Sequence, residues 1–196
     1  MPGLQFRYLL GISVAALIAL AVLWFAWLYP FAFRAPHHQN RENITVAGPT
    51  RVGLLLECIA IAMAFAFRLP PQPASAWYRL LPAILLASAA IPGAWASVTH
   101  LGKQFRLHAG LYVDHQLIQT GPYAIVRHPI YATFLAMLLC SLLLMTPWPW
   151  ALASLSVFLI GTEIRVRSED RLLESRFGDE FRRYRRRVSA YVPFVR

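Results

Sequence analysis

Long stretches without charged residues recur along this chain, and they restrict its fold more than any other feature. The first, from Tyr8 to Phe33, carries no charge and is long enough to cross a hydrocarbon core of about 30 Å with some tilt. Four more apolar stretches follow, in which Glu57 is the only charged residue: 52–67, 80–98, 130–146 and 148–161. The pattern predicts an all-α integral membrane protein with about five transmembrane helices.

The composition agrees with this prediction. Hydrophobic residues make up 58% of the 196 residues, charged residues only 14%, and the mean hydropathy is +0.48. An ordinary soluble domain is about 45–50% apolar, so a soluble domain is excluded.

The last two apolar stretches are each shorter than a standard span. The residues between them, Pro147 to Trp150, are too few for an excursion out of the membrane, so we expect a tight helical hairpin. Beyond Thr162, hydrophobic residues recur at helical spacing among charges, which predicts an amphipathic carboxyl-terminal segment. Gly178 interrupts this pattern and is expected to join two helices.

Five crossings place three polar regions on one side of the membrane: residues 34–51, residues 99–128 and the carboxyl-terminal segment. Their arginines and lysines outnumber those of the other side, and loops rich in these residues remain in the cytoplasm. We therefore expect a multi-pass protein whose polar site faces the cytoplasm and whose amino terminus faces out. In a bacterium this would be the inner (plasma) membrane.

The net charge is +10, and ten of the 19 basic residues, all arginine, lie in the last 32 positions, where five acids offset them. Such a tail could bind nucleic acid, but beside several apolar spans the anionic surface of membrane lipids is the expected partner. We expect no nucleic-acid partner. The sequence leaves the oligomeric state open.

Cysteine and histidine give no sign of a metal centre. Cys58 and Cys140 both fall within apolar stretches, which supports neither a disulfide framework nor a cysteine-based metal site. The six histidines include no H-x-x-x-H pair, so we predict no metal.

The segment from Gly121 to Tyr131 is the best functional clue, because there a polar, histidine-bearing loop turns into a long apolar helix. Pro129 suits the first turn of a helix, since its missing N–H would be unpaired there anyway. Arg127, His128 and the free N–H groups of the new helix should therefore lie together at one membrane edge. Such an edge is a natural seat for a carboxylate-bearing ligand.

Arg165 and Glu169 are four residues apart, so on a helix they share one face and can point into one site. The same spacing also suits a stabilising surface ion pair worth a few tenths of a kcal/mol. Glu57 presents a similar choice. A carboxylate within a span is a functional candidate, but Glu57 lies near the end of its stretch and could pair with Arg51 or reach water.

Taken together, these motifs resemble the isoprenylcysteine carboxyl methyltransferase family and its relatives among membrane phospholipid methyltransferases. The resemblance runs from about residue 100 to residue 194, and the first hundred residues carry only generic membrane helices. The matching residues are His115-Gln116-Leu117-Ile118, Gly121-Pro122-Tyr123, Arg127-His128-Pro129-Ile130-Tyr131, Arg165, Glu169-Asp170, Leu173, Phe177-Gly178, Tyr184 and Pro193. Thr133 departs from the pattern, because many relatives have a glycine there.

The resemblance implies a single membrane methyltransferase domain over residues 1–196. Residues 1–99 would supply three amino-terminal transmembrane helices, and residues 100–196 would bind the cofactor and catalyse. It implies S-adenosyl-L-methionine as methyl donor, S-adenosylhomocysteine as product, and a lipid-like or prenylated acceptor that enters from the bilayer. The implied cofactor positions are His108, His115, Gln116, Leu117, Ile118, Tyr123, His128, Pro129, Ile130, Tyr131 and Glu169; Arg165 would bind the acceptor.

The implied reaction is methyl transfer to a carboxylate, as in isoprenylcysteine O-methylation. It needs alignment of donor and acceptor and removal of water, but no general base. Arg165 would steer the carboxylate, Glu169 would bind the cofactor's ammonium or ribose, and Tyr123 or Tyr131 would pack on its adenine or sulfonium. An amine acceptor, as in phospholipid N-methylation, would require His128 or Glu169 as base. The sequence also leaves open a sterol-reductase-like enzyme that uses NADPH, and a non-catalytic membrane protein.

Overall fold

A computed structural model of the chain describes residues 2–33, 48–67, 77–102 and 116–193, with side chains from residue 17 onward. All regular elements in these ranges are helical. They are α1 (Pro2–Phe33), α2 (Pro49–Ala66), α3 (Trp77–Leu101), the 3-10 helix η2 (Gly121–Ala124), α4 (Pro129–Met145), α5 (Trp148–Phe177) and α6 (Asp179–Arg187). The predicted all-α fold is therefore confirmed.

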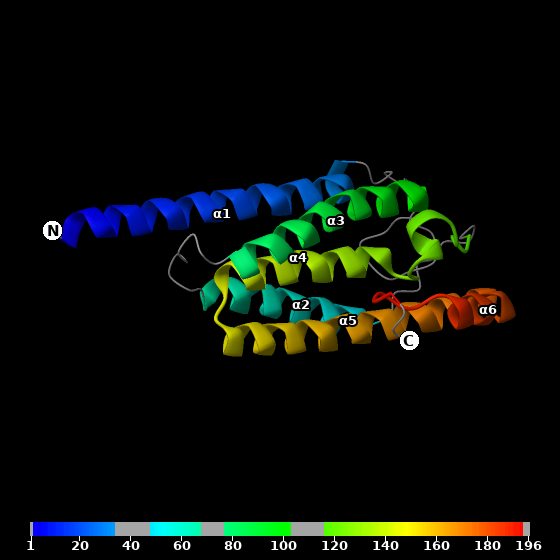
Figure 1. The fold of residues 1–196 in the computed structure, drawn as a ribbon. Coiled ribbons are helices and arrows are strands. Elements are labelled where there is room, and N and C mark those ends of the chain that lie inside the picture. The colour runs from blue at the N-terminus through cyan, green and yellow to red at the C-terminus, as the bar shows by residue number, and fades with distance from the viewer. Residues whose placement is uncertain (1, 34–47, 68–76, 103–115, 194–196) are drawn as a thin grey trace.

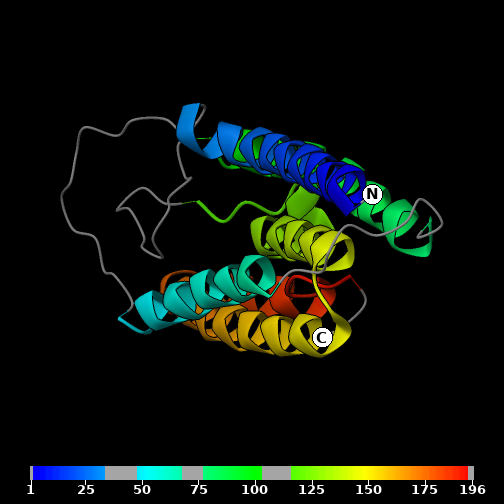
Figure 2. The same ribbon diagram turned by 90° about the vertical axis from the view of Figure 1, so that its left-hand side faces the viewer.

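The long helices pack side by side, as Figures 1 and 2 show. Helix α2 runs along α5, α3 runs along α4, and α1 covers α3. Small residues line the contacts, so the helices approach closely: Ala60 and Ala64 of α2 pack on Leu138 and Phe158. A layer of side chains without charge thus holds the bundle together.

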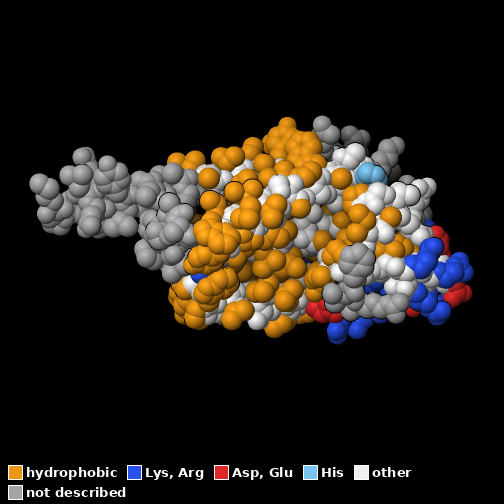
Figure 3. Space-filling view, in the orientation of Figure 1, with side chains coloured by type: hydrophobic (Ala, Val, Ile, Leu, Met, Phe, Trp, Pro, Cys, Tyr) orange, Lys and Arg blue, Asp and Glu red, His pale blue; other side chains and the backbone are white. Residues whose placement is uncertain are grey.

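The outer faces of the bundle are apolar. Phe25, Leu81 and Leu152 are each more than half exposed, and Figure 3 shows hydrophobic side chains over the middle of the face that it draws. Charged side chains gather at one end, over α6 and the end of α5 (Figure 3). Three helices, α2, α3 and α5, are long and apolar enough to cross a membrane, and Leu17–Phe33 and α4 are shorter apolar helices. An apolar girdle with one charged end is what a membrane protein presents to lipid.

The predicted hairpin between residues 146 and 148 is present, but α5 does not end near Gly161 as its apolar stretch suggested. It continues unbroken to Phe177, because no proline follows Pro149 within α5 and the charged residues beyond Gly161 favour a helix as much as apolar residues do. Gly178 adopts φ +50, a conformation that glycine reaches without strain. It ends α5 and begins α6, as predicted.

Arg79, at the start of α3, closes the opposite end of the bundle. Its guanidinium donates to the carbonyls of Leu143 (3.4 Å) and Thr146 (3.3 Å), where α4 ends. It also lies 4.7 Å from the centroid of the Trp148 ring. A cation thus meets the carbonyl end of α4, where the helix dipole favours positive charge.

Two glycines bring α2 and α5 into backbone contact. A Cβ atom on Gly53 would lie 2.6 Å from the carbonyl oxygen of Gly161, and one on Gly161 would lie 2.6 Å from that of Gly53. Any larger residue would therefore push the helices apart. Because α2 and α5 run in opposite directions, the Arg165 side chain lies against Gly53 and from there reaches Glu57, one turn further along α2.

Candidate active site

The loop before α4 is anchored on α3. Gly121 has φ +60, and a Cβ atom there would lie 2.3 Å from the His100 ring, so only glycine fits. The following turn buries Tyr123, whose hydroxyl donates to the Ser97 carbonyl at 3.5 Å. The Tyr123 carbonyl in turn accepts a 2.6 Å bond from the hydroxyl of Tyr184 in α6. This loop is thus held from both sides.

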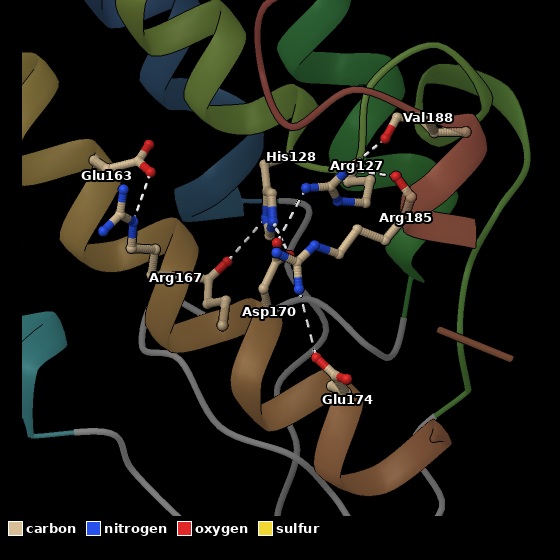
Figure 4. A network of polar contacts seen from close by, with 9 residues as sticks. Arg127, His128, Glu163, Arg167, Asp170, Glu174, Arg185 and Val188 are labelled. Atoms are coloured by element: carbon tan, nitrogen blue, oxygen red, sulfur yellow. Dashed lines mark hydrogen bonds and ion pairs between the residues drawn. The ribbon is translucent and has the colours of Figure 1, made fainter. Parts of the chain in front are cut away.

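The segment after α6 completes the loop. The backbone N–H of Arg127 donates to Ser189 and that of His128 to Ala190, both at 2.8 Å. The Arg127 guanidinium donates to the carbonyls of Arg185, at 3.3 Å, and Val188 (Figure 4). The beginning of α4 therefore depends on the carboxyl-terminal segment for its position.

His128 lies between two carboxylates. Its Nε2 is 2.8 Å from Oδ1 of Asp170, and its Nδ1 is 3.2 Å from Oε2 of Glu169. Asp170 also accepts a 3.0 Å bond from Arg127 (Figure 4). Burial by itself disfavours a charged ring, but the hydrogen bonds that the ring donates to Asp170 and Glu169, together with their negative charges, outweigh it and raise the pKa of His128 to about 9. His128 is therefore an imidazolium that donates from both nitrogens.

Tyr131, the third residue of α4, contacts the Glu169 carboxylate and lies beside Arg165. Its hydroxyl donates to Oε1 of Glu169. Its ring lies 5.8 Å from the His128 ring and 4.8 Å from the Arg165 guanidinium carbon. The structure thus brings together four predicted site residues: His128, Tyr131, Arg165 and Glu169.

Arg165 does not form the surface ion pair with Glu169 that their spacing also allowed. Its side chain is buried, and it donates to Oε2 of Glu57, while Thr162 donates to Oε1 of Glu57 at 2.9 Å. Glu57 is 0% exposed; it neither reaches water nor pairs with Arg51. The Nε atom of Arg165 is buried and has no hydrogen-bond partner in the part of the chain that the structure describes.

The cluster is electrically balanced. The three cationic groups, Arg127, His128 and Arg165, are paired with three carboxylates, those of Asp170, Glu169 and Glu57. Most of these groups are buried. Pairing of this kind is what makes charges tolerable at the end of an apolar bundle.

The remaining predicted residues lie around the cluster or outside the description. His108 and His115 fall outside the described residues. Gln116 is exposed, and Leu117 and Ile118 are half-buried before the loop. Pro129 is buried at the first position of α4, as predicted, and Ile130 is half-buried beside it.

Thr133, the departure from the family pattern, lies in a helix contact. Its Cγ2 would be 2.9 Å from a Cβ atom on Gly93 of α3. Its hydroxyl donates to Ile130 at 2.9 Å and accepts from the Trp27 indole at 3.1 Å. Gly93 on α3 therefore leaves the space that the Thr133 side chain occupies, so the helices can pack closely without a glycine at position 133.

Two residues of the network had no predicted role in the site: Asp170, which holds His128, was only a member of the family motif, and for Glu57, which holds Arg165, the sequence left a functional and a bland interpretation open. A signal for Glu57 does exist in the sequence. Gly53 and Glu57 are four residues apart, as are Gly161 and Arg165, so each pair lies on one helical face. A small residue and a charge of opposite sign on two apolar helices suit a close crossing.

Comparison with known proteins identifies the stretch that carries this geometry. Residues 83–175 match the isoprenylcysteine carboxyl methyltransferase (ICMT) family. This match confirms the resemblance drawn from the motifs. It includes His128, Tyr131, Arg165 and Glu169, whereas α2 with Glu57 and α6 lie outside it.

Two curated relatives agree with the ICMT match. A protein-S-isoprenylcysteine O-methyltransferase of Schizosaccharomyces pombe is 33% identical over 82 residues, which are 42% of this chain and 35% of the relative. Protein-S-isoprenylcysteine O-methyltransferase B of Arabidopsis thaliana is 33% identical over 112 residues, 57% of this chain and 54% of the relative. The matches span about a third and about half of these relatives' lengths.

Proposed function

We propose that the protein transfers a methyl group from S-adenosyl-L-methionine to the carboxylate of a lipid-like acceptor, as in isoprenylcysteine O-methylation. One observation carries the proposal: a buried arginine, Arg165, has an unpartnered Nε atom within the ICMT-matching stretch, where the apolar helices end. An acceptor with a long apolar tail would remain in the bilayer while its carboxylate reaches Arg165. S-Adenosylhomocysteine would be the product.

The residues at the start of α4 suit this cofactor. His128 gives no side-chain cap to α4, so the first N–H groups after Pro129 remain available for the cofactor's carboxylate. Glu169 is about a quarter exposed and offers its carboxylate to an ammonium or a ribose hydroxyl. The Tyr131 ring already faces one cation, Arg165, at 4.8 Å, and aromatic faces also suit a sulfonium.

The cofactor, when bound, supplies the electrophilic methyl group. The residues of the chain orient the donor and the acceptor and exclude water from the site. Arg165 would hold the acceptor carboxylate with its free donor, and Glu57 would fix the Arg165 guanidinium from the other side. The methyl donor is cationic and the acceptor is anionic. Binding of both would therefore leave the net charge of the site unchanged. Alignment and exclusion of water supply most of the rate enhancement in such a transfer.

The state of His128 favours a carboxylate acceptor over an amine. Amine methylation requires a base to remove a proton, and an imidazolium that donates to two carboxylates has no free lone pair. Glu169 alone would remain for that role, and it already accepts from Tyr131 and His128. Phospholipid N-methylation is therefore the second candidate.

We further propose that the charged end of the bundle faces the cytoplasm, in the inner (plasma) membrane if the organism is bacterial. The carboxyl ends of α1 and α3, from which the polar stretches 34–47 and 103–115 continue, lie at the same end as α6 (Figure 1). The excess of arginine and lysine in these polar parts of the sequence supports the assignment through the positive-inside rule.

The test uses purified protein in detergent. Calorimetry should detect binding of S-adenosyl-L-methionine, and a prenylated-cysteine analogue should accept its labelled methyl group. NADPH serves as the control ligand, because only a ligand that binds the folded state raises the thermal midpoint. A midpoint raised by NADPH alone would establish a reductase instead.

A further inference from the structure

A cleft of about 800 Å³ lies beside the proposed methyl-transfer site and is separate from it. The end of α5, α6 and residues 190–192 form its walls. It shares Arg127 and Asp170 with the charged cluster, but Tyr131, Arg165 and Glu169 do not line it. The methyl-transfer chemistry therefore leaves the cleft without a role.

The lining is strongly basic. Its arginines are Arg127, Arg167, Arg171, Arg182, Arg185 and Arg186, against the acids Glu163, Asp170 and Glu174. Each acid is already paired with an arginine of the lining: Glu163 with Arg167, Asp170 with Arg127, and Glu174 with both Arg182 and Arg185. The surplus charge is thus positive, and Figure 3 shows the basic side chains gathered at this end.

Arg171 is the clearest donor for a ligand. It is exposed, and it forms no hydrogen bond or ion pair with any residue that the structure describes. On the opposite wall, α6 buries Phe181 and Tyr184 against the protein and leaves Arg182, Arg185 and the neighbouring arginines exposed. Donors thus converge on the cleft from two helices.

The position of the cleft along α5 relates it to the membrane surface. The apolar part of α5 ends at Gly161, and Glu163 and Arg167, the first charged residues on one face, already line the cleft. The cleft therefore begins where a helix that crosses the bilayer enters the headgroup layer. Arginine binds phosphate oxygens in a forked, bidentate geometry, and basic residues at this depth attract anionic lipids.

We propose that this cleft binds the phosphate of an anionic glycerophospholipid from the surrounding bilayer. Arg171 from α5 and Arg185 from α6 hold the phosphate oxygens, and the acyl chains lie along the apolar face of α5. This lipid is a bound partner and not the methyl acceptor, since the cleft does not contain Arg165 or Tyr131.

The test compares two charge-matched variants of the full-length chain in an uncharged detergent. Arg171→Gln/Arg185→Gln removes one arginine of each wall, and Arg176→Gln/Arg183→Gln removes one exposed arginine from each of the same helices outside the cleft. Thermal midpoints are titrated with dioleoylphosphatidylglycerol, dioleoylphosphatidylcholine and inorganic phosphate. We expect phosphatidylglycerol alone to stabilise the wild type, with apparent affinity reduced at least tenfold in the cleft variant and less than twofold in its control.

Three results would overturn the proposal. Equal loss in both variants would mean that total charge and not the cleft attracts the lipid. Unchanged affinity in the cleft variant would place the lipid elsewhere. Stabilisation by inorganic phosphate at the same concentration as by lipid would identify a site for free anions. None of these results depends on methyl-transfer activity, so the test is independent of the proposed function.

Discussion

The buried pair between Glu57 and Arg165 allows a sharp prediction about stability. Glu57 is fully buried, the side chain of Arg165 is 10% exposed, and Thr162 satisfies the second Glu57 oxygen. Glu57→Leu leaves the arginine as an uncompensated buried cation, and breaking a buried pair in this way costs about 3–5 kcal/mol. The double variant Glu57→Leu/Arg165→Met removes both charges and should recover most of that loss, because an apolar pair of similar volume is often as stable.

The measurements are unfolding by titration with a denaturing detergent and turnover with a prenylated-cysteine analogue. We expect the double variant to unfold close to the wild type yet to remain inactive, because Arg165 is absent. Glu163→Gln is the control, since it breaks an exposed i,i+4 pair with Arg167 worth at most a few tenths of a kcal/mol. A loss below about 1 kcal/mol in Glu57→Leu, or a double variant no more stable than the single one, would refute the reasoning.

Four further predictions concern the site and the helix contact. His128→Ala should weaken S-adenosyl-L-methionine binding at least roughly tenfold, about 1.4 kcal/mol, by calorimetry; unchanged affinity in a folded variant removes His128 from the cofactor seat. Because the folded pKa of His128, about 9, exceeds its ordinary 6.5, its contribution to stability is complete below pH 6.5 and is lost as pH rises through 9; thermal midpoints should show this decline in the wild type and not in His128→Gln. Arg165→Ala should keep cofactor affinity while kcat/KM falls roughly a hundredfold, whereas Glu169→Ala should weaken cofactor binding. Equal loss of cofactor affinity in both variants would mean that Arg165 binds the cofactor and not the acceptor. Gly53→Ala should destabilise the bundle measurably in the same unfolding assay and Gly48→Ala should not, since a Cβ atom at 53 meets Gly161 and one at 48 meets nothing within 4 Å.

The helices were predictable because each apolar stretch carries at most one charged residue and polar or turn residues separate the stretches, and the start of α4 was predictable because Pro129 follows a loop with turn residues. The end of α5 at Gly178 was predictable from the glycine, but the apolar stretch alone does not show that α5 continues past Gly161, because the charged continuation differs from the apolar part in composition but not in helical propensity. Within the site, His128, Tyr131, Arg165 and Glu169 come from one family pattern. The partners that fix them, Asp170 and Glu57, reach the site through contacts between helices. The spacing of residues within one helix does not show that α2 and α5 are neighbours, so these contacts could not be predicted.

The backbone bonds from Arg127 and His128 to Ser189 and Ala190 have a consequence for biosynthesis. Helices α1 to α5 precede residues 188–190 in the chain and are therefore synthesised before these residues. Without residues 188–190 the His128 amide lacks its acceptor, and the Arg127 guanidinium lacks the carbonyl of Val188. The apolar helices and the bonds that fix the start of α4 therefore come from separate parts of the chain, and we expect a released chain that is truncated ahead of Ser189 to be integrated in the bilayer yet unable to retain S-adenosyl-L-methionine.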